Sequence, residues 1–165
     1  MAMIDELLFI KSFREQQAET VLMRSRAEFR VAQAAEEQAQ KTHSDFLKQA
    51  QEDELRWYRE LCARLVKVRD IEDVQQAVVG LRLREVALDD ERQAKERERE
   101  QAQEGVRMAN ERLKLASSAK HKFKELARQH HLEVSREGER KEETELEELA
   151  GVVREREEWG GSADG

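Results

Sequence analysis

The chain has 165 residues, of which 41% are charged, and it contains no proline. Its formal net charge of −7 argues against a general nucleic-acid-binding protein, because neutralising phosphates requires clustered Lys and Arg. Few aromatic and β-branched residues disfavour a sheet, whereas abundant Ala, Glu, Leu, Lys and Arg favour helix. The composition therefore predicts an all-α protein, and its narrow apolar stripes between wide charged faces suit a coiled coil rather than a globule.

The first predicted helix covers about residues 3–68. It starts with an apolar run and continues as a stripe of small and large apolar residues: Ile4, Leu7, Leu8, Ile10, Phe13, Val21, Leu22, Phe29, Ala32, Ala35, Ala39, Phe46, Ala50, Trp57, Leu61, Leu65 and Val68. The run at residues 7–10 is too short for a membrane span and no basic segment precedes it, so we expect no signal peptide and no direct membrane insertion.

A reversal of the chain is predicted at about residues 69–72. Lys67 and Arg69 suit a helix C-terminus, while Asp70, Glu72 and Asp73 suit an N-terminus, where Asp70 could cap the second helix with Asp73 as its capping-box partner. No Gly, Pro or Asn marks this turn. The alternative is one continuous helix of about 150 residues that dimerises in parallel, since a three-residue slip also occurs inside coiled coils.

The second predicted helix covers about residues 73–150 and follows a 3.5-residue repeat. Its seam consists of Val74, Val78, Leu81, Glu85, Leu88, Arg92, Lys95, Arg99, Ala102, Val106, Ala109, Leu113, Ala116, Lys120, Phe123, Ala127, His130 and Val134. In an antiparallel hairpin, the basic stretch of this seam faces roughly residues 45–52 and is expected to pair with Asp45, Glu52 and Asp53. Residues 1–150 are thus predicted to form a single two-helix coiled-coil hairpin, favoured as a monomer, and residues 151–165 a flexible tail.

No pattern for enzymatic chemistry is present. The sequence has neither a Walker-type phosphate loop nor a dinucleotide fingerprint, and none of its four histidines (His43, His121, His130 and His131) forms an i,i+4 pair. Cys62 is the single cysteine and has no persuasive activating neighbour. We therefore expect no catalysis, no metal and no cofactor.

Two groups of residues are candidate partner-binding sites. The first lies at the expected tip: Trp57, Tyr58, Arg64, Lys67 and Arg69. Adjacent Trp57 and Tyr58 point about 100° apart on a helix, so the seam can bury one and leave the other exposed as an anchor. The second is a basic patch for an acidic partner: Lys120, Lys122, Lys124 and Arg128. Both groups also have a structural interpretation. Trp57 and Tyr58 could both pack on the apolar tip, and the basic patch could be an ordinary solvated helix face.

The sequence resembles a known family. An acidic, proline-free chain of this size, with an apolar start (Ile4-Asp5-Glu6-Leu7-Leu8-Phe9-Ile10-Lys11) and two long helices, is similar to the YscO proteins of type III secretion systems, which are similar to the flagellar protein FliJ. The resemblance covers about residues 3–150 and implies an antiparallel hairpin.

The same resemblance implies a function and partners. The expected role is a central stalk that links the hexameric export ATPase to the export gate in the membrane, stimulates ATP hydrolysis and, in some members, binds chaperones of secreted proteins. Such a protein is cytoplasmic and peripheral to the inner-membrane secretion apparatus. Two other classes stay open on the sequence alone: a coiled-coil scaffold and a helical-hairpin chaperone cofactor.

Overall fold

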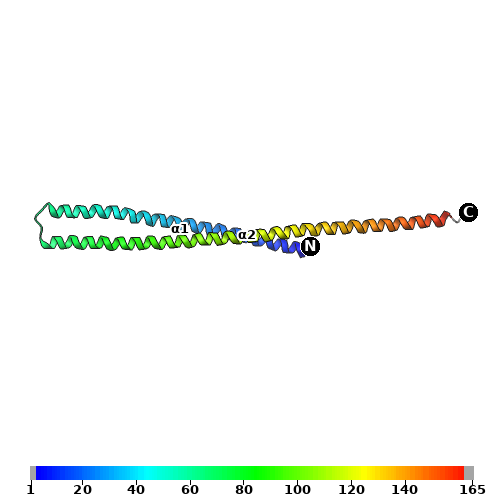
Figure 1. The fold of residues 1–165 in the computed structure, drawn as a ribbon, viewed down its shortest axis with the longest axis horizontal. Helices are drawn as coiled ribbons and strands as arrows, with labels where there is room; N and C mark the ends of the chain where they lie inside the picture. The colour runs from blue at the N-terminus through cyan, green and yellow to red at the C-terminus, as the bar shows by residue number, and fades with distance from the viewer. Residues whose placement is uncertain (1–2, 162–165) are drawn as a thin grey trace. The chain divides into compact units, whose positions relative to one another are not determined.

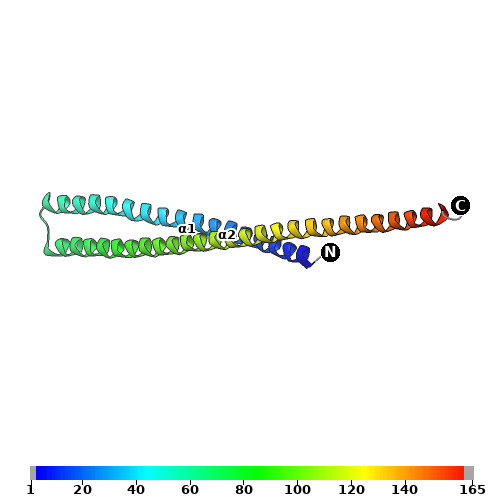
Figure 2. The same ribbon diagram turned by 45° about the vertical axis from the view of Figure 1, so that its right-hand side comes forward.

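A computed structural model describes residues 3–161, which form two helices joined by a short turn. Helix α1 spans Met3–Cys62 and helix α2 spans Val68–Gly161, and residues 3–161 include no strand. Next to the turn, Figures 1 and 2 show α1 and α2 side by side with opposite chain directions. The predicted all-α antiparallel hairpin is confirmed, and the alternative of one continuous helix is excluded because the chain reverses at residues 63–67.

The contacts of the chain divide it into two compact units. We call residues 17–113, which contain the turn, the turn unit, and we call residues 3–16 together with 114–161 the terminal unit. Within each unit, a part of α1 packs against a part of α2.

The turn begins earlier than the sequence analysis predicted. α1 ends at Cys62 rather than near residue 68, and α2 begins at Val68 rather than near residue 73. The reason is the role of Asp70, which is not the N-cap of α2. Its carboxylate accepts a hydrogen bond of 3.0 Å from the backbone N–H of Lys67, while the Lys67 carbonyl accepts one of 3.0 Å from the Asp70 N–H. Lys67 is thus the N-cap and Asp70 the third helical residue of a half capping box, which moves the start of α2 back by about one turn.

The packing in the turn unit follows the predicted seam. Every predicted seam position of α2 between Val74 and Leu113 is buried or half-buried, and Leu88 and Ala109 are buried most. On α1 the matching positions run in the same steps of three and four, with Leu22 buried and Phe29, Phe46 and Ala50 half-buried. Two narrow stripes facing each other therefore form a thin core, as a two-stranded coiled coil does.

In the terminal unit the seam ends at Ala127, which is buried. His131 lies 3.0 Å from Asp5, close to the first described residue of α1, and every residue of α2 from 132 to 161 is exposed. The predicted seam positions His130 and Val134 are exposed, which corrects that part of the prediction. We call residues 132–161 of α2 the overhang; Figures 1 and 2 show it continuing past the N-terminal end of α1.

The overhang also corrects the prediction for the C-terminus. Residues 151–161, expected to be a flexible tail, continue α2 as helix, and residues 162–165 lie outside the described part of the chain. Neither α1 nor α2 contains a stretch that is both long and apolar enough to span a membrane.

Candidate protein-binding surfaces

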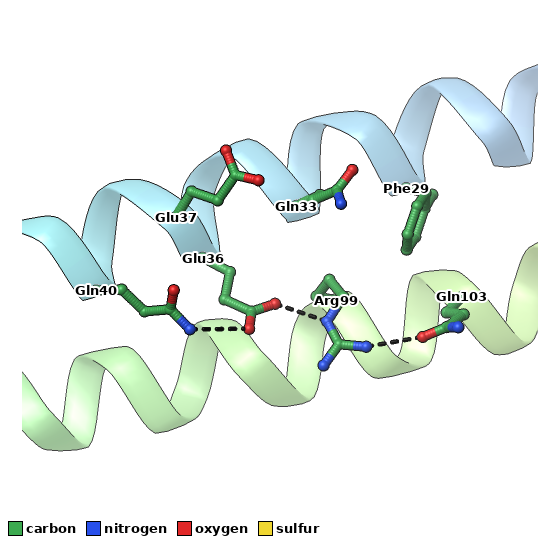
Figure 3. A pocket seen from close by; sticks show the side chains of 7 residues that line it. All are labelled: Phe29, Gln33, Glu36, Glu37, Gln40, Arg99 and Gln103. Atoms are coloured by element: carbon green, nitrogen blue, oxygen red, sulfur yellow. Dashed lines mark hydrogen bonds and ion pairs between the residues drawn. The ribbon is translucent and has the colours of Figure 1, made fainter.

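A polar cluster interrupts the apolar seam of the turn unit. The Arg99 guanidinium of α2 donates a hydrogen bond of 2.6 Å from Nε to the Glu36 carboxylate of α1 and one of 2.7 Å from Nη1 to Gln103 (Figure 3). Gln40 donates to the same carboxylate at 3.3 Å. The hydrogen bond and charge of Glu36 raise the pKa of Arg99. The cluster borders an open pocket of about 350 Å³, lined by Phe29, Gln33, Glu36, Glu37, Gln40, Arg99 and Gln103.

These partners differ from the expected ones. Asp45 and Glu52 are exposed, and Asp53 pairs with Arg56 of its own helix at 3.0 Å. The cause is the position of the turn, because in an antiparallel hairpin an earlier turn moves every facing residue of α1 toward the N-terminus. The basic stretch of α2 therefore faces residues around Glu36 and His43, where Asp89 lies 4.0 Å from His43.

Further ion pairs cross between the helices within each unit. In the turn unit, Arg82 pairs with Glu54 at 3.2 Å. In the terminal unit, the Lys120 ammonium donates to the Glu15 carboxylate at 3.0 Å, and the hydrogen bonds from Lys120 and Ser117 lower the pKa of Glu15. Pairs of opposite charge between the two helices favour one alignment, because slipping the helices would separate the partners. Their role is alignment of the hairpin rather than chemistry.

The candidate tip residues gather around the turn. Trp57 is half-buried in the seam, and neighbouring Tyr58 is 44% exposed, which is the arrangement expected of adjacent helical positions. Arg64 and Lys67 lie in the turn and Arg69 in the first turn of α2, and all three are exposed. The exposed Cys62 ends α1. The turn thus presents basic and aromatic side chains to solvent.

The candidate basic patch lies in the terminal unit and is partly neutralised. Lys120 is half-buried and paired with Glu15, and Arg128 pairs with Glu125 at 2.6 Å, a contact that raises the pKa of Arg128. Lys122 and Lys124 are exposed. The structure therefore divides the four residues into two that serve the hairpin's own ion pairs and two that face solvent.

A surface that the sequence analysis missed lies on α2 in the turn unit. Val79, Leu83 and Val86, which we call the outer stripe, recur at i, i+4 and i+7 and are 57%, 68% and 58% exposed. Their positions lie outside the seam formed by Val78, Leu81, Glu85 and Leu88. The signal was present in the sequence as a second apolar period, offset from the seam. Beside the stripe, a Cβ added to Gly80 would meet nothing within 4 Å, so the hairpin itself does not require a glycine there.

The overhang is the most acidic part of the described chain. Residues 132–161 contain eleven carboxylates and five basic side chains, so they hold nearly the whole net charge of −7. Among the residues that the structure describes, no group of three or more His, Cys, Asp and Glu side chains could hold a metal ion.

Comparisons with known proteins agree with this architecture. The family model described as Type III secretion protein YscO matches residues 4–152. A crystal structure of type III secretion protein YscO from Vibrio parahaemolyticus is similar to the chain with a TM-score of 0.80 and 27% sequence identity, and the match covers 88% of this chain and 92% of that one. No curated protein matches the chain significantly.

Proposed function

Because the chain belongs to the YscO family of type III secretion proteins, we propose that it is a central stalk of an export apparatus, joining the hexameric export ATPase to the export gate in the membrane. The proposed role is non-enzymatic, since a stalk acts by binding and by biasing the conformation of its partners. The expected location is the cytoplasm, at the periphery of the inner-membrane apparatus.

The outer stripe is the observation that carries this proposal. Soluble coiled coils place charged residues on the face opposite their seam, whereas here Val79, Leu83 and Val86 are exposed over two turns. Gly80 lies beside them although a glycine inside a helix costs about 1 kcal/mol relative to alanine. A glycine that the hairpin does not need leaves room for a partner backbone to approach closely. We assign this stripe, together with the tip residues, to the contact with the export gate.

The contact with the ATPase has a different character. A ring that hydrolyses ATP changes shape in each cycle, so a stalk inside it benefits from polar contacts that break and re-form easily. The charged faces of the hairpin and the acidic overhang supply such contacts. Through them the stalk would stimulate ATP hydrolysis.

Secretion chaperones are a further proposed partner class. Lys122 and Lys124 are exposed in the terminal unit and are the members of the basic patch that remain for an acidic partner surface. Exchanging both for Gln is expected to weaken chaperone binding.

The first experiment tests the outer stripe. The purified chain is mixed with the cytoplasmic domain of the gate protein and, separately, with the ATPase, and the affinities are measured by calorimetry. Leu83→Ala is expected to weaken gate binding by about tenfold, because an exposed leucine buried in an interface contributes roughly 1–2 kcal/mol. ATPase stimulation should be unchanged.

The matched control is Leu115→Ala, which removes a leucine of α2 that is similarly exposed, at 72%. This variant should bind the gate like the native chain. If the native chain binds neither the gate domain nor the ATPase, the stalk proposal fails. If Ala substitutions at Trp57, Tyr58, Arg64, Lys67 and Arg69 leave every partner bound, the tip assignment fails.

A further inference from the structure

The first turns of α1 carry a second apolar surface within the terminal unit. Leu7, Ile10 and Phe13, which we call the N-terminal row, are 38%, 44% and 52% exposed, and Met3 extends the row at 76%. Ile4 and Leu8, about 120–160° around the helix from Ile10, are half-buried and belong to the seam. A helix that is apolar on two faces is normally covered on both. Here α2 covers one face and leaves the N-terminal row open.

The charges beside the row indicate what covers it. Glu6 and Arg14 lie on the same side of α1 as Ile10, each four residues away from it, and both are exposed. If a second α1 packs antiparallel with Ile10 at the centre, Glu6 of each copy lies opposite Arg14 of the other, and Leu7 lies opposite Phe13. A parallel pairing would place Glu6 against Glu6 and Arg14 against Arg14, which is unfavourable. The row is therefore complementary to itself in the antiparallel direction.

The size of the surface sets the strength of such a contact. The exposed fractions of the four side chains add up to about two large side chains, or on the order of 400 Å² per copy at about 200 Å² for each side chain. Two copies would bury about 800 Å² in total, which is below the size of a stable interface and in the range of weak, transient contacts. We propose that two copies of the chain associate weakly and reversibly through the N-terminal row, with their α1 helices antiparallel.

The overhang supports the same direction of pairing. It continues α2 from the same unit and holds six net negative charges. Antiparallel pairing sends the two overhangs in opposite directions, whereas parallel pairing would place them side by side and repel the copies. The same charge disfavours an anionic lipid surface as the occupant of the row.

Sedimentation velocity of the full chain across the micromolar range tests the proposal. The mass is expected to rise from monomer toward dimer with concentration, and the combined variant Ile10→Ser, Phe13→Ser should remain monomeric. Both side chains lie away from α2, so helicity measured by circular dichroism should be kept. The control is Val31→Ser, which makes a comparable change at an outer position of α1 that is 72% exposed and should leave dimerisation unchanged.

Charge exchange tests the direction of pairing. Glu6→Arg or Arg14→Glu alone should weaken the dimer by about tenfold, because each puts like charges together twice in a symmetric interface, and the two changes combined should restore it. A monomer at all concentrations overturns the proposal. If the combined variant Ile10→Ser, Phe13→Ser still dimerises, the N-terminal row is not the interface. If the combined charge exchange fails to restore dimerisation, the two α1 helices do not pair in the antiparallel direction.

Discussion

Single ion pairs align the two helices, and the pair between Glu15 and Lys120 is the clearest to test because of its effect on pKa. The pKa of Glu15 is lowered in the folded chain by its hydrogen bonds to Lys120 and Ser117. A lowered pKa adds stability above the unfolded-state pKa of about 4.3, and this stability is lost as the pH falls through the folded-state value. Thermal melts from pH 7 down to pH 3 should therefore show a smaller loss of stability for Glu15→Gln than for the native chain.

Lys120→Gln is the partner control for this prediction. Without the ammonium group, the pKa of Glu15 is raised toward its ordinary value. The loss of stability between pH 7 and pH 3 should therefore be smaller than in the native chain, as it is for Glu15→Gln. Acid profiles of Glu15→Gln and the native chain that run parallel would contradict the assignment. The pair was not predicted from the sequence, although Lys120 was placed in the seam, because its partner depends on where the turn falls.

The seam of α2 is the element that the sequence predicted best. Between Val74 and Ala127 every position that the 3.5-residue repeat names is buried or half-buried, polar Arg92, Lys95 and Arg99 included. This works because in a two-helix coiled coil burial depends almost wholly on position in the repeat. The repeat does not say where the packing ends, so His130 and Val134, which are exposed, were placed in the seam.

Leu88 and Leu83 separate the two apolar surfaces of α2. Leu88 is buried in the seam, so Leu88→Ala should lower the free energy of unfolding by about 2–3 kcal/mol, at the lower end for leucine because the core is thin. Leu83 is in the outer stripe and 68% exposed, so Leu83→Ala should change the free energy of unfolding by less than about 0.5 kcal/mol. Urea denaturation of both variants measures this difference. Equal losses of stability would mean that the outer stripe also supports the hairpin.

The turn shows where element-level prediction failed. The acidic residues after Arg69 were correctly recognised as a helix start, but Asp70 fits both the N-cap and the third helical position. The backbone hydrogen bonds at Lys67 decide between the two, and the sequence alone does not contain them. The predicted turn lay about five residues too late in the chain. The partner of Arg99 was therefore expected near Asp45, whereas the observed partner is Glu36, two to three helical turns closer to the N-terminus.

At the scale of the whole molecule, charge is divided very unevenly along the chain. Residues 1–131 contain 25 acidic and 25 basic side chains, so the part that forms the hairpin is neutral and the excess lies in the overhang. Neutrality lets two charged helices pack without net repulsion. A helix with net negative charge whose residues are all exposed contributes little to folding, which favours a role in binding for the overhang.

Removal of the overhang separates these two roles. A chain that ends at His131 should lose about 30 helical residues from its circular dichroism signal, while the midpoint of its thermal transition should shift by less than about 3 °C, because the pairing of α1 with α2 is intact. Gate binding through the outer stripe should be kept, whereas stimulation of the ATPase should fall if the overhang supplies its polar contacts. A midpoint lowered by much more than this would show that the overhang stabilises the hairpin. If the shortened chain stimulates the ATPase fully, the ATPase contact lies on the hairpin and not on the overhang.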